Sequence, residues 1–255
     1  MITVGKIPLI ASLPMYARPE LNDAIAYLWD LIRKNLNDKG IKAPETLSQD
    51  AEGLSSWLDP SLVLSQTCGM PYRNVLHGKV QLVGTPDYGL PDCPPGHYFS
   101  AIVVRKSDPR QALKDYAEAI FAYNMENSQS GFAAPLNYAA ARGVKFTNRI
   151  ESHGHVKSAE MVVNGQADIA AIDAVTWMLI ERHDAFSSKL RVLERTTPST
   201  PALPLITSLT LDVDQVYDAV NQAIQDLPQD MRDAMFLKGI VKISASDYLK
   251  IPNPK

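Results

Sequence analysis

Short β-rich runs alternate with amphipathic helical segments along the whole chain, and this alternation limits its fold more than any other feature. The clearest strands are predicted at Tyr98–Val104 and Ile169–Ile172, which are rich in β-branched and apolar residues. A long helix is predicted at Glu20–Lys39, where apolar residues recur at helical spacing and Gly40 follows as a helix-ending residue. The pattern predicts an α/β architecture with largely parallel sheets.

The other predicted elements keep the same alternation. Further strands are expected at Ile7–Leu13, Ser61–Ser65, Val80–Val83, Ile120–Tyr123, Lys145–Ile150, Leu190–Leu193 and Leu205–Leu209. Further helices are expected at Tyr72–Leu76, Pro109–Glu118, Gly131–Arg142, Ser158–Val163, Ala174–Glu181, Val213–Leu227 and Asp230–Leu237.

Two proline-rich stretches, Thr85–Gly96 and Thr196–Pro204, interrupt the alternation. Proline restricts the backbone, so these stretches are expected to be stiff connections. Their positions suit a chain that builds one lobe, crosses to a second and returns to the first. The alternative is a single-lobed sheet with two proline-rich loops.

Composition excludes several classes of function. The 255 residues carry a net charge of -3, so no general positive field attracts nucleic acid or an anionic membrane. Any bound anion must therefore be held by a local site. No apolar run approaches the roughly 18 residues of a membrane span. The N-terminal stretch has one lysine and is broken by Pro8, which makes a poor signal peptide. Either the chain is cytoplasmic, or an export signal was removed before this sequence was recorded.

The two cysteines, Cys68 and Cys93, do not define a disulfide framework, and their spacing does not suggest zinc. Either they pair in an oxidising compartment or they are separate thiols. Both alternatives stay open at this point.

A first polar segment, Asn127–Gly131, lies between the predicted strand Ile120–Tyr123 and a predicted helix. The hydroxyls of Ser128 and Ser130 suit either capping of the helix or, together with its first amides, an anion. Gly131 would let a ligand approach the backbone closely.

A second polar segment, Glu151–His155, also lies between a strand and a helix. On an extended segment, His153 and His155 would place both rings on one face and suggest a metal site. The simpler interpretation needs no metal: His155 alone donates a hydrogen bond to an oxyanion at the helix start.

Further polar residues follow other predicted strands. Asp173 lies at the carboxyl end of the strand Ile169–Ile172, the edge at which α/β sheets bind ligands, although it could simply cap the next helix. Thr67 follows the strand Ser61–Ser65 and Tyr16 follows the first strand. Asp50 lies in a strand-to-helix loop, where it could also be only a cap. All these residues follow a strand and precede a helix, which predicts a shared cleft.

The sequence resembles a known family over roughly residues 7–210. The resemblance rests, in chain order, on the runs SQTCGMPYR, GTPDY, PPGHYFSAIVVRKSD, NSQSG, SHGHVKS and ADIAAIDAV. They are similar to the substrate-binding proteins of phosphate, phosphite and phosphonate ABC importers.

The resemblance implies an α/β, two-lobed, type 2 periplasmic-binding-protein-like fold with two mixed sheets flanked by helices. Two crossovers would lie near Cys93–Ser100 and Phe186–Thr196. Residues 1–95 plus 191–255 would form lobe 1 and residues 96–190 lobe 2, with the ligand cleft between them.

Residue by residue, the family's phosphonate-holding Ser-x-Ser-Gly segment matches Ser128, Gln129 and Ser130, with glutamine where many relatives carry threonine. The family histidine matches His155, preceded by His153-Gly154 where relatives often carry glycine-serine. Asp173 matches a position that holds a carboxylate or an amide.

The function implied by the resemblance is capture of a small oxyanion ligand, a phosphonate, phosphite or phosphate-like solute, for an ABC permease in the periplasm. No cofactor, metal, nucleic acid or catalytic activity is expected. A carboxylate beside a dianion is repulsive, so Asp173 is expected to face an ammonium group or to accept an acidic proton, and thereby to exclude sulfate.

Two alternatives come from other classes of function. A cytoplasmic ligand sensor or heterocycle binder would use the same fold. A serine hydrolase would use Ser130, His155 and Asp173, but the chain has no Gly-x-Ser-x-Gly nucleophile elbow.

Overall fold

The computed structural model describes residues 8–49, 51 and 53–254. The chain divides into two compact units, each with a five-stranded sheet. Unit 1 consists of Met1–Cys68, Tyr72–Gly89 and Pro201–Ala245. Unit 2 consists of Gly69–Pro71, Leu90–Thr200 and Ser246–Lys255.

The sheet of unit 1 has the order β1-β2-β11-β3-β12. Its strands are β1 (Ile10–Ser12), β2 (Leu62–Gln66), β11 (Leu205–Thr207), β3 (Gln81–Asp87) and β12 (Gly239–Val241). Strand β1 runs parallel to β2, whereas β11 and β12 run antiparallel to their neighbours. The sheet is therefore mixed.

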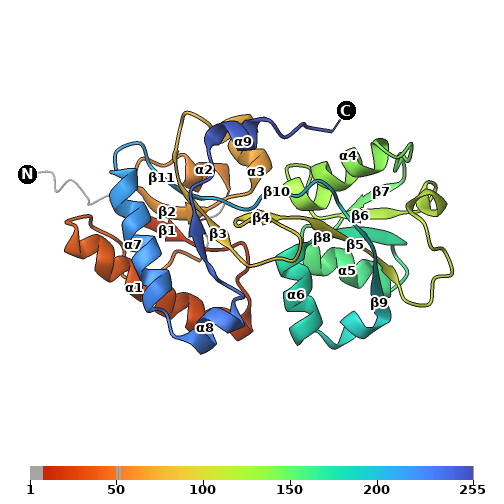
Figure 1. Cartoon of the computed structure of the whole chain (residues 1–255), viewed down its shortest axis with the longest axis horizontal. Helices are drawn as coiled ribbons and strands as arrows, with labels where there is room; N and C mark the ends of the chain where they lie inside the picture. The colour runs from red at the N-terminus through yellow and green to blue at the C-terminus, as the bar shows by residue number, and fades with distance from the viewer. Residues whose placement is uncertain (1–7, 50, 52, 255) are drawn as a thin grey trace, which may run out of the picture. The chain divides into compact units, whose positions relative to one another are not determined.

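The main helices of unit 1 are α1 (Asn22–Asp38), which follows the short 3-10 turn η1 (Pro19–Leu21), and α7 (Val213–Asp226). They come from opposite ends of the chain but pack against each other (Figure 1). Each buries one apolar face, as the helical spacing of its apolar residues predicts. Asp212 caps α7 by accepting hydrogen bonds from the N–H groups of Asp214 and Gln215.

Shorter elements complete unit 1. They are α2 (Leu54–Trp57), the π-helix η2 (Tyr72–Leu76) and α8 (Gln229–Ala234). Two further short helices belong to unit 2, wholly for α3 (Gly69–Pro71) and from its second residue onward for α9 (Ala245–Leu249).

The sheet of unit 2 has the order β7-β6-β8-β5-β9. Its strands are β7 (Arg149–Glu151), β6 (Phe121–Tyr123), β8 (Ile169–Asp173), β5 (Ser100–Arg105) and β9 (Leu190–Arg195). Strands β7, β6 and β8 are parallel, and β5 is antiparallel to both β8 and β9.

Helices cover this second sheet, and a core lies on each of its faces. They are η4 (Gln129–Ala133) continuing into α4 (Ala134–Ala140), α5 (His155–Val163), α6 (Ala174–His183), and the 3-10 helices η3 (Leu113–Tyr116) and η5 (Ala185–Lys189). Successive residues of β5 alternate between the two cores, Ile102 and Val104 on one face and Ala101 and Val103 on the other.

The chain passes between the units next to β4 (His97–Tyr98) and β10 (Thr200–Pro201), which form a two-stranded sheet. The longest segment of unit 2 runs from Leu90 to Thr200, a wider range than the expected 96–190, and its later end includes β9 because β9 pairs with β5. The segment after Ala245, expected in lobe 1, also belongs to unit 2. Thr85–Asp87, expected in a stiff connection, instead continues β3.

The α/β class with two mixed sheets is confirmed, but the expectation of largely parallel sheets is wrong. Strand–helix alternation does not reveal strand direction, and β5, β11 and β12 run antiparallel to their neighbours. Where a helix was expected at Pro109–Glu118, the structure has only the short 3-10 helix η3. Within the described residues, no helix has the length and apolar character needed to cross a membrane.

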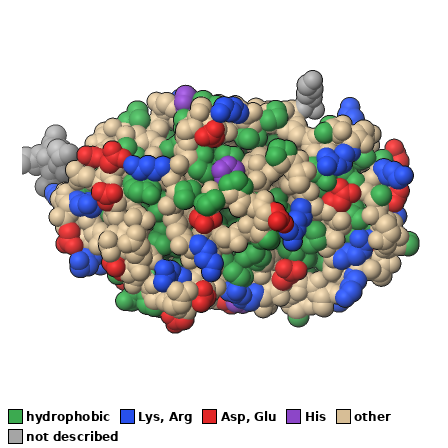
Figure 2. Space-filling model, viewed as in Figure 1, with side chains coloured by type: hydrophobic (Ala, Val, Ile, Leu, Met, Phe, Trp, Pro, Cys, Tyr) green, Lys and Arg blue, Asp and Glu red, His purple; other side chains and the backbone are tan. Residues whose placement is uncertain are grey.

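The fold also places the tryptophans and the two cysteines. The three tryptophans, Trp29, Trp57 and Trp177, are buried in the core. Cys68 and Cys93, whose pairing stayed open, do not form a disulfide with each other, and both have intermediate exposure. Figure 2 shows Lys and Arg side chains interspersed with Asp and Glu over the face in view, in keeping with the small net charge.

Candidate ligand-binding site

Several polar residues of unit 2 meet at one edge of its sheet. Asn124 follows the last residue of β6, Asp173 ends β8, and Ser100 begins the antiparallel strand β5 directly opposite Asp173. Each of these three side chains is at least nine-tenths buried. Buried polar groups are costly unless they are hydrogen-bonded, so their partners indicate what each residue does.

Ser130 is the centre of this cluster. Its Oγ atom lies 3.0 Å from Nε2 of His155, and its backbone carbonyl accepts a 2.7 Å hydrogen bond from the Ser100 hydroxyl. Among the described residues, no hydrogen bond uses the backbone N–H of Ser130. That N–H lies in the first turn of η4, where the helix leaves its amides available to an anion.

Asn124 is a site residue that the sequence analysis missed. Its Nδ2 atom lies 3.4 Å from Nε2 of His155. A Cβ atom added to Gly131 would lie only 2.0 Å from Asn124 Oδ1 and 3.0 Å from Cε1 of His155. Gly131 was expected to make room for a ligand, but here it makes room for Asn124. Only its position directly after β6 could have signalled Asn124.

His155 is held neutral by its surroundings. The residue is partly exposed, but its ring atom Nδ1 is buried. Burial lowers the pKa of His155 to about 4, and a contact with the Ala171 backbone opposes the shift only in part. An amide nitrogen can only donate, so Nε2 accepts from Asn124. In this arrangement Nε2 of His155 orients Ser130 and Asn124.

Ser128 and Asp173 both act as helix caps. The Ser128 Oγ atom accepts a 3.0 Å hydrogen bond from the Gly131 N–H at the start of η4. Asp173 Oδ1 accepts from the amides of Val175 and Thr176 at 2.8 and 3.0 Å. The capping alternatives considered from the sequence thus apply to both residues. Gln129, between the two serines, is buried at the start of η4.

His153 does not join this cluster. Its backbone φ is +63°, so the segment is not the extended one that would place both histidine rings on one face. The His153 side chain is 80% exposed and lies 3.8 Å from the Glu151 carboxylate. In the described part of the chain, no three His, Cys, Asp or Glu residues are grouped as metal ligands.

Unit 1 places two expected residues at the carboxyl ends of its strands. Tyr16 follows β1, and its ring meets that of Tyr88 edge-on, with centroids 5.2 Å apart. Thr67 follows β2 and is fully buried, and its N–H donates to the Pro204 carbonyl at 3.0 Å. Its Oγ1 atom has no hydrogen-bond partner among the described residues. Asp50 lies outside the described residues.

The geometry does not assemble a Ser-His-Asp triad. Ser130 Oγ does lie within hydrogen-bond reach of His155 Nε2. However, Nδ1, the ring atom that the acid of a triad would bind, has no hydrogen-bond partner among the described residues. Asp173 instead caps α6.

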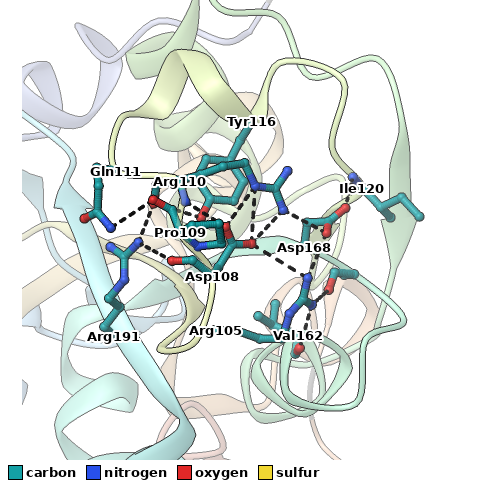
Figure 3. Close-up of polar contacts among 11 residues, drawn as sticks. Arg105, Asp108, Pro109, Arg110, Gln111, Tyr116, Ile120, Val162, Asp168 and Arg191 are labelled. Atoms are coloured by element: carbon teal, nitrogen blue, oxygen red, sulfur yellow. Dashed lines mark hydrogen bonds and ion pairs between the residues drawn. The ribbon is translucent and has the colours of Figure 1, made fainter.

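A second polar cluster lies at the opposite edge of the same sheet and is charged (Figure 3). Asp108 accepts hydrogen bonds from Arg110, whose Nη2 atom lies 2.7 Å from Asp108 Oδ2 and 3.1 Å from Asp168 Oδ1. Arg105 binds Asp168 at 2.9 Å and also donates to the carbonyls of Val162 and Ala167. The guanidinium of Arg191 donates to two backbone carbonyls of the same loop.

Within this second cluster the charges of two arginines, Arg105 and Arg110, balance those of two aspartates, Asp108 and Asp168. Hydrogen bonds from Arg110 hold the pKa of Asp108 far below its usual value, although burial opposes this. The Arg110 guanidinium also stacks over the Tyr116 ring, 4.1 Å from its centroid. We therefore assign this cluster a structural role, which is to stabilise the fold.

Comparison with known proteins places the fold and the family. The model of one protein family, described as the periplasmic substrate-binding protein of phosphonate ABC transporters, matches residues 64–248. No curated protein matches the sequence.

Solved structures share the fold at low sequence identity. PhnD1 from Prochlorococcus marinus in complex with methylphosphonate aligns with a TM-score of 0.70 and 15% identity, over 94% of each chain. A binding protein component of an ABC phosphonate transporter from Pseudomonas aeruginosa gives 0.69 and 16%, over 96% of this chain and 84% of that one. XAC2383 from Xanthomonas citri bound to ATP gives 0.69 and 16%, over 95% and 94%.

These structures have the two-sheet α/β fold of periplasmic binding proteins, as this chain does. The family consists of small-ligand carriers that work with a membrane permease, and its members are not enzymes. Because the family match spans most of the sequence, the chain belongs to the periplasmic substrate-binding proteins of phosphonate ABC transporters.

Proposed function

We propose that this protein binds a phosphonate, or a closely related phosphite or phosphate-like oxyanion, around Ser130 and delivers it to a permease. The observation that carries the proposal is the uncharged cluster of Ser130, Asn124 and His155, together with the N–H of Ser130, which no hydrogen bond among the described residues uses. A backbone N–H at a buried residue is costly without an acceptor, and an oxyanion would supply one.

The proton of the Ser130 hydroxyl makes the site adaptable. Without ligand, this hydroxyl and the Asn124 amide share the Nε2 atom of His155. On binding, the hydroxyl turns its proton to a phosphonyl oxygen, while Asn124 keeps Nε2 paired. Neutral His155 adds no charge of its own, so recognition rests on dipoles and hydrogen bonds.

Unit 1 would complete the coordination. Thr67, with its unpaired buried hydroxyl, and Tyr16 lie at the carboxyl edge of their sheet, just as Ser130 and Asn124 do in unit 2. We propose that the ligand bridges these two edges, as the expected two-lobed division implied. Each hydrogen bond to a charged group contributes about 1.5–3 kcal/mol, and micromolar affinity requires about 8 kcal/mol. A handful of such donors is therefore sufficient, after the cost of closure is met.

Asp173 would set the protonation state that the site accepts. Oδ1 caps α6, so the carboxylate is held in place beside the cluster. A fixed carboxylate repels a fully deprotonated dianion and favours a ligand that keeps an acidic proton or carries an ammonium group. Sulfate, which has no such proton at neutral pH, would be rejected.

Titration calorimetry with methylphosphonate, 2-aminoethylphosphonate, phosphite, phosphate, sulfate and a pyrimidine tests the proposal. One phosphonate or phosphite should bind with micromolar or better affinity and raise the apparent stability by ~2.7 kcal/mol at a hundredfold excess over Kd. Ser130→Ala should weaken binding about 10- to 100-fold. The control Ser188→Ala removes an exposed hydroxyl that donates to the Ala185 carbonyl, and should leave phosphonate affinity unchanged.

Binding of the pyrimidine alone would favour the heterocycle binder. Turnover of activated esters or phosphoesters that disappears in Ser130→Ala would favour the hydrolase. Either result would overturn the oxyanion proposal.

A further inference from the structure

Unit 1 contains an apolar cavity, and the proposed contacts to the oxyanion head group leave it without a role. Its volume is about 60 Å³. Side chains of α1 and α7, among them Leu28, Ile32, Val220 and Ile224, form its walls. Among the described residues, no charged side chain lines it. These two helices pack on each other, so the cavity lies where their apolar faces meet the sheet.

Tyr16 of the proposed site and two of its neighbours, Gln66 and Tyr88, form the polar part of the cavity lining. Tyr16 and Tyr88 follow the carboxyl ends of β1 and β3, and Gln66 is the last residue of β2, next to Thr67. Gln66 Nε2 already donates to the Leu203 carbonyl at 3.2 Å, and the two tyrosine rings meet edge-on. The cavity therefore borders the sheet edge that carries the unpaired Thr67 hydroxyl.

A cavity with such apolar walls favours a hydrocarbon group over water. A buried water needs two to four polar partners, and cavities with apolar walls stay dry and accept apolar molecules. At about 10–15 Å³ for each water-sized group, the space takes roughly four or five such groups. That is the size of a short alkyl chain.

We infer that the cavity takes the alkyl substituent of an alkylphosphonate, a chain of about three or four carbons on the phosphorus atom. The inference rests on the proposed function, because the head group must be held by the site around Ser130 and Thr67. An aminoalkyl chain of the same length fits poorly, since no carboxylate lines the cavity to pair with its ammonium group.

The test is a homologous series of methyl-, ethyl-, propyl-, butyl- and hexylphosphonate, measured by titration calorimetry on the unaltered protein. Affinity should rise about fourfold for each added methylene. The rise should stop near butyl, when the cavity is full. 3-Aminopropylphosphonate, which matches butylphosphonate in length, should bind at least tenfold more weakly than butylphosphonate.

Ile25→Phe fills the cavity from α1 and should reduce the ratio of butyl- to methylphosphonate affinity to about one. The matched control is Ile41→Phe, which follows α1 but is not among the lining residues, and it should keep the ratio of the unaltered protein.

The outcomes separate this inference from the proposed function. If methylphosphonate binds but affinity is flat or falls along the series, the cavity inference is wrong and the proposed function stands. If no phosphonate binds at all, the proposed function is overturned and the inference with it. Because the series uses the unaltered protein, the result does not depend on whether Ile25→Phe folds.

Discussion

The two ends of the unit 2 sheet carry polar clusters of opposite character. At one end, Arg105, Asp108, Arg110 and Asp168 form a charged network, and its arginines reach several backbone carbonyls (Figure 3). At the other end, Ser100, Asn124, Ser130 and His155 form a network whose hydrogen bonds are all between uncharged groups. Strands β5 and β8 contribute to both ends.

The difference shows how a buried polar cluster that stabilises the fold can be distinguished from one that can bind a ligand. The charged end balances itself, so removing one charge leaves its partner buried and unpaired. At the neutral end, the N–H of Ser130 has no acceptor in the described part of the chain, and one hydroxyl has a proton that can turn to another acceptor. Polarity alone therefore does not mark a binding site. Hydrogen-bond donors that lack an acceptor are the feature that indicates a binding site.

The largest expected effect is at the charged end. Asp108→Ala removes the carboxylate that Arg110 binds, and should lower the free energy of unfolding by about 3–5 kcal/mol. Urea denaturation measures it. The control Asp38→Ala removes an exposed pair with Lys34 and should cost less than about 1 kcal/mol. If the two variants lose equal stability, the charged cluster is not the structural element described here.

The two ends should also respond to acid in different pH ranges. The pKa of His155 is lowered from 6.5 to about 4, so between these values the unfolded chain binds a proton that the folded chain does not. Stability should fall by up to about 3 kcal/mol as the pH drops through this window. The lowered pKa of Asp108 acts only below its ordinary value of 3.8.

Denaturation of the unaltered protein and of His155→Gln at several pH values measures this difference. The variant should lose less stability between pH 6.5 and pH 4, while both proteins lose stability alike below that range. Parallel curves throughout would show that His155 is not held neutral by burial.

An intermediate effect is expected from one methyl group at the neutral end. Gly131→Ala would place its Cβ atom 2.0 Å from Asn124 Oδ1, so Asn124 must move away from His155. Overpacking of this kind costs about 1–3 kcal/mol of folding stability. Phosphonate affinity should fall by about tenfold, because the displaced Asn124 no longer orients His155 and Ser130.

Gly154→Ala is the matched control, because no atom lies within 4 Å of its added methyl group. Its φ of 177° is extended backbone that any residue adopts. Calorimetry should give it unaltered affinity. Equal losses in the two variants would remove Asn124 from the site.

The smallest expected effect on stability is that of Asp173→Asn. Asparagine keeps the oxygen that caps α6, so the free energy of unfolding should change by less than about 1 kcal/mol. Selectivity should change more, because the repulsion of dianions disappears and sulfate begins to bind. Unchanged sulfate rejection together with unchanged phosphonate affinity would show that Asp173 is only a cap.

Part of the candidate site could be predicted from sequence position alone. Ser130, His155 and Asp173 each follow a strand and precede a helix, and the structure brings the first two within 3.0 Å. Their roles could not be predicted so well. Ser128 caps η4 and His155 accepts a hydrogen bond, because these roles depend on which atoms become neighbours. Asn124 had no signal in the sequence beyond its place after β6.

The sequence by itself determined the α/β class, the amphipathic helices α1 and α7, and the family. These follow from local periodicity and from short motifs, both of which can be recognised in the sequence alone. Only the tertiary structure decided that β5, β11 and β12 run antiparallel, that His155 is neutral and that Gly131 shelters Asn124. Strand direction, burial and close contact join residues that are distant along the chain, so no local pattern contains them.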